Sequence, residues 1–119
     1  TVMGAEMLSR ITQLKSHPTY QYAYDIARHH HERWDGRGYP DHLKGNEISI
    51  PAQIVSIADV YDALVSQRVY KKAFSFDTAL KMIADGACGC FNPDLLEEFL
   101  KVEKDFRPFY VNIEKGDLR

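Results

Sequence analysis

The sequence lacks several features that would each have set the class of protein. No apolar run approaches the roughly 20 residues that a membrane-spanning helix requires. Basic side chains are too few to form a strongly positive surface, because 15 Lys and Arg stand against 17 Asp and Glu, for a net charge of −2. We therefore expect neither a membrane span nor binding to a nucleic-acid polymer.

Cysteine is also scarce. Only Cys88 and Cys90 occur, and the single glycine between them makes the pair too tight for an ordinary metal site and too strained for an easy disulfide. We expect both thiols to be reduced. The remaining composition, 45% apolar and 27% charged over 119 residues, is that of one globular domain with one core.

The spacing of apolar residues predicts an all-α fold, a helical bundle of about five helices. Ser16 or His17 with Pro18, Ser49 with Pro51, Ser75, and Asn92 with Pro93 resemble helix starts. The expected inward residues of the five helices are Met7, Leu8, Ile11 and Leu14; Tyr20, Ala23, Tyr24 and Ala27; Ile54, Ile57, Tyr61 and Leu64; Phe76, Ala79, Leu80, Ile83 and Ala87; and Leu95, Leu96, Phe99 and Leu100.

Two segments do not fit this periodicity. Residues 35–49 contain three glycines and a proline, which predicts a loop, and long loops inside small domains are usually functional or disordered. Residues after about 106 show no clear period, so we expect them to pack as a tail or to pair as a short strand.

Two histidines and two aspartates are candidates for a metal site. His30 and His31 extend the apolar stripe of the second expected helix, through about residue 31, where a single histidine would more often be a hydrogen-bonded core residue. Asp59 and Asp62 lie three residues apart among apolar residues of the third helix, where a carboxylate needs Arg, Lys or a metal ion. Imidazole and carboxylate ligands without thiolate suit iron, manganese or zinc.

Basic residues follow the third expected helix, among them Arg68 and Lys71. Cations at a helix C-terminus commonly interact with the helix dipole. The same side chains could also hold a phosphate group next to a metal site. The spacing alone leaves both interpretations open.

The segment HHERWDGRGYP, followed downstream by IVSIADVYDALVSQRVYKKA, resembles the HD-GYP family, a branch of the HD phosphohydrolase superfamily. The resemblance covers about residues 4–100. It implies a bacterial, cytoplasmic, HD-domain/phosphodiesterase-like helical domain. It also implies hydrolysis of cyclic di-GMP to pGpG or GMP with two or three divalent metal ions, most commonly iron or manganese.

The resemblance further implies a role for individual residues. The metal ligands would be His30, His31 and Asp59, while His29 would be a solvated or capping residue. Asp59 and Lys71 would act in catalysis, and the substrate contacts would be Asp62, Arg68 and Lys71. The loop that gives the family its name would bind partner proteins with a GGDEF domain, braced by Glu32 and Asp35; its residues here are Asp35, Gly36, Gly38, Tyr39 and Pro40.

The family is named for a His-Asp dyad, and no His-Asp pair in that order occurs in this sequence. We therefore expect residues 1–106 to be the C-terminal part of an HD-GYP domain, truncated on its N-terminal side, with residues 107–119 as a tail. About half of the ligand set is present, so the chain alone should hold one ion weakly or none and be inactive. Exposed apolar faces on the first two helices predict a homo-oligomer, for example by helix exchange.

Three functions are consistent with these residues. The first is a cyclic di-GMP phosphodiesterase in a longer parent protein. The second is a catalytically inactive module that binds a cyclic dinucleotide or docks GGDEF-domain partners through the GYP loop. The third is an HD phosphohydrolase for another nucleotide, against which Trp34 and the GYP loop argue; a related cyclic dinucleotide remains open. We favour the first because His30, His31 and Asp59 are all intact.

Overall fold

The computed structural model describes residues 2–10, 16–66 and 72–114. The described residues form α-helices and short 3-10 helices, with one isolated β-bridge and no named strand, which confirms the predicted all-α class. The elements are α1 (Val2–Arg10), α2 (Tyr20–His29), η2 (Gly45–Glu47), α3 (Ile50–Val65), α4 (Phe76–Ala84), α5 (Pro93–Val102), η3 (Glu103–Asp105) and α6 (Arg107–Glu114).

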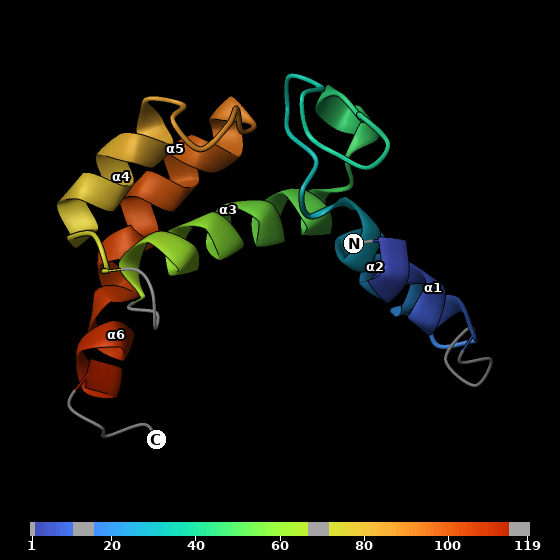
Figure 1. The fold of residues 1–119 in the computed structure, drawn as a ribbon, viewed down its shortest axis with the longest axis horizontal. Coiled ribbons are helices and arrows are strands. Elements are labelled where there is room, and N and C mark those ends of the chain that lie inside the picture. Colours follow the sequence, from blue (N-terminus) through green and yellow to red (C-terminus); the bar gives the residue numbers. More distant parts are fainter. Residues whose placement is uncertain (1, 11–15, 67–71, 115–119) are drawn as a thin grey trace.

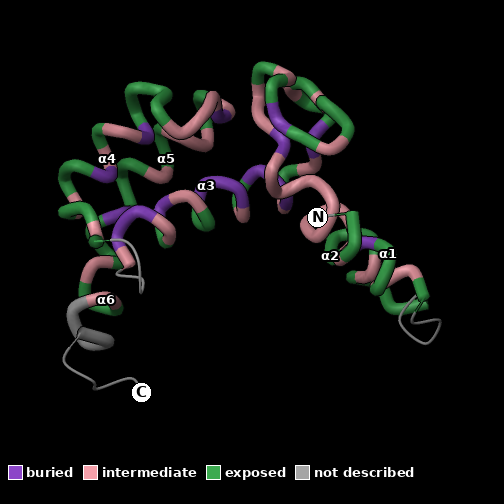
Figure 2. The backbone as a smooth tube through the Cα atoms, viewed as in Figure 1, coloured by how far each residue is buried: buried purple, intermediate pink, exposed green. Residues whose placement is uncertain are grey.

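Helix α3 is the element around which the others are arranged. It begins after Ser49, whose hydroxyl accepts a hydrogen bond from the Ala52 amide at 3.4 Å, and it has a proline in its first turn. Helices α1 and α2 lie at one end of it, and α4 and α5 lie along the other (Figure 1). Buried residues concentrate along α3, as Figure 2 shows, so this helix connects the two halves of the molecule.

The core lies between α3, α4 and α5. Its buried members are Ile57, Tyr61, Leu64, Val65, Ala79, Ile83 and Phe91. Three of the four predicted inward residues of α3 are therefore confirmed, but Ile54 is 50% exposed. The caps of the two following helices are also confirmed, because Ser75 accepts from the Thr78 amide and Asn92 from the Asp94 amide.

Helix α2 is shorter than predicted at both ends. It starts at Tyr20, after a turn in which the Thr19 amide donates to the His17 ring, and it ends at His29. His30 and His31 therefore lie in the turn after the helix and not on its apolar stripe. The turn is fixed by a hydrogen bond from the Glu32 amide to the His29 carbonyl at 3.0 Å. Local periodicity does not reveal this interaction.

Two further predictions at helix ends were wrong. Ala87, expected on the inward face of the fourth helix, is exposed because α4 ends at Ala84 and Gly86 adopts a φ of +81°. Residues 107–114, expected as a tail or a strand, form α6. Ile11 and Leu14 lie outside the described residues.

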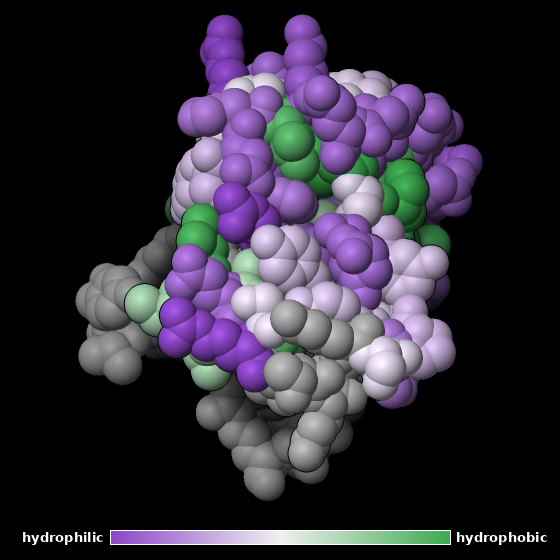
Figure 3. Space-filling model, turned by 90° about the vertical axis from the view of Figure 1, so that its right-hand side faces the viewer, coloured by the Kyte–Doolittle hydropathy of each residue, from purple (hydrophilic) through white to green (hydrophobic). Residues whose placement is uncertain are grey.

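Helices α1 and α2 are poorly covered by the rest of the chain. Ala5 is the single buried residue of α1, and α2 has none. Met3 is 76% exposed, Met7 63% and Tyr22 56%. From the side that is on the right in Figure 1, apolar side chains reach the surface in separate patches among polar ones (Figure 3). Association between copies remains a prediction. In the described part of the chain, no helix has the length and apolar character to cross a membrane.

The junction between α3 and the C-terminal helices contains a buried carboxylate. Glu103 is fully buried, accepts a hydrogen bond from the Tyr61 hydroxyl, and is bound by Arg107 Nε at 2.9 Å from each oxygen. Arg107 also pairs with Asp77 at 3.0 Å. Burial and the Glu103 carboxylate raise the pKa of Tyr61, so the hydroxyl stays protonated as a donor. This network attaches η3 and α6 to the core.

We expect Glu103→Ala to destabilise the fold by about 2–3 kcal/mol, because it leaves the buried Tyr61 hydroxyl without an acceptor. The measurement is the midpoint of urea unfolding. Glu97→Ala, which removes an exposed carboxylate 3.7 Å from Lys101, is the control and should change stability by less than about 0.5 kcal/mol. Equal midpoints for the two variants would contradict a structural role for Glu103.

Candidate metal centre

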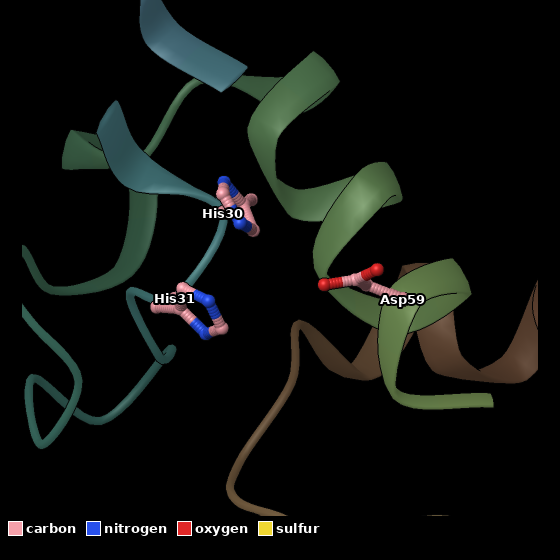
Figure 4. A group of neighbouring side chains, drawn as sticks. All are labelled: His30, His31 and Asp59. Carbon is pink, nitrogen blue, oxygen red and sulfur yellow. The ribbon is translucent and has the colours of Figure 1, made fainter. Parts of the chain in front are cut away.

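Three predicted ligands come together between the turn after α2 and the middle of α3. The potential ligand atoms of His30, His31 and Asp59 all lie within 4.8 Å of one another. The two imidazole rings come from consecutive residues of the turn, and the Asp59 carboxylate points toward them from α3 (Figure 4). Two nitrogens and a carboxylate oxygen are a ligand set that suits a divalent transition metal ion.

The His30 ring is oriented by the end of its own helix. Its Nδ1 lies 2.6 Å from the Ile26 carbonyl oxygen, which accepts only if Nδ1 carries the proton. Nε2 is then the unprotonated nitrogen. A histidine that donates one ring N–H to a backbone carbonyl and presents the other nitrogen to the ion is the usual arrangement in metal sites.

His31 is held by aromatic neighbours. Its ring is stacked on the Tyr39 ring, with centroids 5.0 Å apart and 12° between the planes, and its centroid lies 4.3 Å from that of His30. Burial is the main cause that lowers the pKa of His31, and the neighbouring His30 and Arg33 lower it further. The neutral imidazole, which is the form that binds metal, is therefore favoured at neutral pH.

The aspartates of α3 are more exposed than predicted. Asp59 and Asp62 are both exposed, because Ala58 and Ile54 on this side of α3 are not covered within the chain. The two carboxylates also differ in their partners. Asp59 faces the histidines, whereas Asp62 accepts hydrogen bonds from Tyr110 at 3.0 Å and Ser66 at 3.1 Å.

Asp62 lines a second feature, a mainly apolar groove of about 510 Å³ between α3, α5 and α6. Burial and the bond to Asp62 raise the pKa of Tyr110 to about 12. Among the described residues, Asp62 is therefore not part of the cluster that could bind a metal ion. Arg68 and Lys71, the other expected substrate contacts, lie outside the described residues.

The GYP loop is attached through Glu32 to the turn that carries the candidate ligands His30 and His31, the metal turn. This side chain is 2% exposed, and its carboxylate accepts hydrogen bonds from the amides of Asp41 at 2.7 Å and Leu43 at 2.9 Å. The loop thus folds back over the residue that directly follows His31. The expectation that Glu32 braces the loop is confirmed.

Gly38 lies where the loop touches the turn. A Cβ at this position would lie 2.5 Å from the Arg33 nitrogen and 2.5 Å from the Glu32 Cα, and would also meet the His31 carbonyl oxygen. These are backbone atoms that cannot rotate away. Glycine is therefore required here by the close approach of two backbone segments.

The other predicted loop residues shape its surface. Asp35 is exposed, accepts from the Arg37 amide at 3.1 Å and forms the isolated bridge to Lys44. Gly36 takes a φ of +81° and donates to the Arg33 carbonyl at 2.9 Å. Pro40 is half-buried, and its peptide bond to Tyr39 is cis.

Arg33 is a residue of the site region for which no role could be predicted from the sequence. Its guanidinium donates to the Ser56 hydroxyl of α3 at 2.9 Å, to the Cys88 carbonyl at 3.3 Å and to the Glu32 carbonyl at 3.1 Å, and it lies over the Phe91 ring. It thereby joins the metal turn to α3 and to the segment before α5. The sequence does show a cationic residue within the GYP motif. The residues that Arg33 contacts in α3 and before α5, however, are distant from it in sequence. Cys88 and Cys90 are not bonded to each other.

His29 is neither solvated nor a simple cap, which corrects the prediction for it. Its Nε2 lies 2.7 Å from Asp41 Oδ2, and Arg28 binds both oxygens of the same carboxylate at 2.8 and 3.0 Å. These two partners, Arg28 first, hold the pKa of Asp41 well below its usual range. His29, Glu32 and Asp41 lie close enough to bind an ion, but their acceptor oxygens already have partners, so we assign none to them.

A model of the HD domain family matches residues 2–95, and the chain therefore belongs to that family. The chain is similar to a cyclic di-GMP phosphodiesterase of Vibrio cholerae, with 50% identity over 84 residues, which are 71% of this chain and 17% of that protein. It is 41% identical over 110 residues to a cyclic di-GMP phosphodiesterase of Thermotoga maritima, covering 92% of this chain and 29% of the relative. These matches confirm the resemblance that the HHERWDGRGYP segment predicted.

A third relative has a different named substrate. It is a 3'3'-cGAMP-specific phosphodiesterase of Vibrio cholerae, 37% identical over 103 residues, which are 87% of this chain and 19% of that protein. The chain thus spans between 17% and 29% of the length of these curated relatives.

We expect Gly38→Ala to destabilise the fold by about 1–3 kcal/mol, because the new methyl group must push the loop away from the turn. The urea unfolding midpoint is the measurement. Gly4→Ala is the matched control: its Cβ would lie 3.6 Å from that of Ala27, inside α1, so alanine should be neutral or stabilising. Loss of stability in both variants alike would count against the close approach at Gly38.

We expect Glu32→Gln to loosen the loop selectively, because a glutamine side chain has one acceptor oxygen for two amides. The amide protons of Asp41 and Leu43 should then exchange faster with solvent, which NMR-detected hydrogen exchange measures. Glu47→Gln is the control. Glu47 accepts a hydrogen bond from the Lys44 amide at 2.8 Å, which glutamine can still accept. Unchanged exchange at Asp41 and Leu43 in Glu32→Gln would refute this role.

Proposed function

We propose that the protein carrying this chain is a metal-dependent phosphodiesterase that hydrolyses a cyclic dinucleotide, in the first place cyclic di-GMP to pGpG or GMP. The observation that carries this proposal is the convergence of His30, His31 and Asp59 on one point, within 4.8 Å of one another. The relatives named above support the choice of reaction. The alternative of a catalytically inactive module gains no support from them.

The residues present fit a divalent metal ion. His30 presents Nε2 because Nδ1 is bound to the Ile26 carbonyl, His31 favours the neutral form, and Asp59 supplies a carboxylate. When bound, such ions activate water and offset charge on phosphate near neutral pH. We propose iron or manganese, with two or three ions in the intact domain, further ligands coming from the His-Asp dyad that this chain lacks.

The remaining predicted residues would bind the dinucleotide and partner proteins. We propose that Arg68 and Lys71 hold its phosphates and that Lys71 offsets the charge that develops during hydrolysis. Asp62 would contact the substrate, which requires its carboxylate to leave Tyr110. The GYP loop would bind GGDEF-domain partners through Tyr39. This proposal is supported by the exposure of Tyr39, which is 54% at the loop surface.

The experiment that tests the proposal has two parts. Both parts use the protein that carries the chain. Binding of Mn²⁺ is measured by calorimetry, and hydrolysis of cyclic di-GMP and 3'3'-cGAMP is measured with and without a chelator. His30→Ala and Asp59→Asn should each lower Mn²⁺ affinity and the rate of hydrolysis by at least about 100-fold. Mutating a residue that only hydrogen-bonds to a metal ligand typically costs about 10–100-fold, and loss of a ligand itself should cost more.

The matched controls are His17→Ala and Asp94→Asn, which change an exposed histidine and an exposed aspartate outside the cluster. Both should leave metal binding and hydrolysis unchanged. Hydrolysis that survives the chelator, or that His30→Ala and Asp59→Asn do not alter, would refute the metal-dependent mechanism. Faster cleavage of 3'3'-cGAMP than of cyclic di-GMP would show that the proposed substrate is wrong, while the proposed reaction, hydrolysis of a cyclic dinucleotide, would stand.

A further inference from the structure

We infer that Tyr39 is a positioning residue for the metal ligand His31, in addition to any role at the loop surface. The inference rests on the proposed metal centre. It assigns to the tyrosine of the GYP loop a function inside the site: its ring fixes the plane of the His31 imidazole and so the direction of the ligand nitrogen.

The two histidines are oriented by different means. The His30 ring is fixed by its bond of 2.6 Å to the Ile26 carbonyl. In the part of the chain that the structure describes, the His31 ring makes no hydrogen bond to protein, and its ring contacts are with His30 and Tyr39. A ligating histidine normally needs a group behind it that sets the ring orientation. For His31, the Tyr39 ring, stacked on the face of the imidazole, is the group that can set the ring orientation.

The geometry of the contact suits this role. The planes of His31 and Tyr39 are 12° from parallel and the centroids are 5.0 Å apart, an offset-stacked arrangement. A stacked neighbour opposes rotation of the imidazole out of the common plane, because the rings would collide. The contact with His30 is tilted by 42° and defines no such plane.

Tyr39 can hold His31 only if its own backbone is fixed, and it is. The Tyr39 amide donates to the His31 carbonyl at 3.3 Å, so the two stacked residues are also joined by their main chains. Gly38, directly before Tyr39, packs against the backbone of residues 31–33, and Glu32 binds the Asp41 amide just beyond. The loop therefore delivers the tyrosine ring to one place above His31.

The test compares Tyr39→Phe with Tyr39→Leu in the protein that carries this chain, using Mn²⁺ affinity measured by calorimetry. Phenylalanine keeps the stack and should bind Mn²⁺ within about twofold of the unaltered protein. Leucine removes the flat ring and should bind about tenfold more weakly, as is typical when a group behind a metal ligand is lost. Tyr22→Leu, at an exposed tyrosine of α2, is the control and should change nothing. Equal affinities for the Phe and Leu variants would overturn the inference.

A second measurement needs neither a variant nor a metal ion. In the metal-free chain, NMR should show nuclear Overhauser contacts between the rings of His31 and Tyr39, and ring-current shifts of the His31 ring protons that persist in Tyr39→Phe. Absence of both would overturn the inference even if Tyr39→Leu failed to fold. If these signals are present but His30→Ala does not change Mn²⁺ affinity, the proposed metal centre is refuted. The positioning role of Tyr39 is then refuted as well, because it requires His31 to be a metal ligand. If His30→Ala weakens binding and Tyr39→Leu does not, the positioning role alone is refuted.

Discussion

The buried carboxylate of Glu32 is the interaction on which the site depends. A carboxylate removed from water is costly unless hydrogen bonds replace its hydration, and here the amides of Asp41 and Leu43 supply them. Because Glu32 directly follows His31, these two bonds bring the returning half of the loop against the metal turn. That approach leaves no room for a side chain at Gly38. The GYP loop is thus part of the structure that supports the proposed metal centre.

Arg33 complements Glu32 on the other side of the same turn. Its guanidinium binds the Ser56 hydroxyl of α3, three residues before Asp59, and the Cys88 carbonyl in the segment that leads to α5. Two consecutive residues of opposite charge therefore fix the turn to separate parts of the molecule. Glu32 holds the loop, and Arg33 holds the helix that carries Asp59, the third proposed ligand. The distance between the histidines and Asp59 is consequently set by contacts just outside the ligand set.

The sequence predicted the features that depend on neighbouring residues, such as helices and their caps. It did not predict the features that depend on contacts between residues far apart in the chain. Helices α3, α4 and α5 and their caps followed from apolar spacing and from serine, asparagine and proline at the helix starts. The end of α2 did not, because it depends on the turn to which the loop attaches. The exposure of Ile54 and Asp59 did not either, since a helix pattern shows which residues share a face but not whether another element covers it. The three proposed ligands were identified from a motif, whereas the bonds of Arg33 and the stacking of Tyr39 on His31 are visible only in the folded structure.

The early end of α2 has a consequence for the site. Consecutive side chains on an α-helix diverge by about 100°, so two adjacent histidines within a helix would point to different sides of it. The helix ends at His29, with His30 as its C-cap, and the rings of His30 and His31 both lie near the same carboxylate. A turn lacks the regular hydrogen bonds that keep a helix rigid, however, and its geometry must come from elsewhere. The geometry of the turn is instead set by four contacts: the hydrogen bonds of Glu32, those of Arg33, the close approach at Gly38 and the stacking of Tyr39 on His31. This accounts for the closely spaced residues with special roles that follow the histidines.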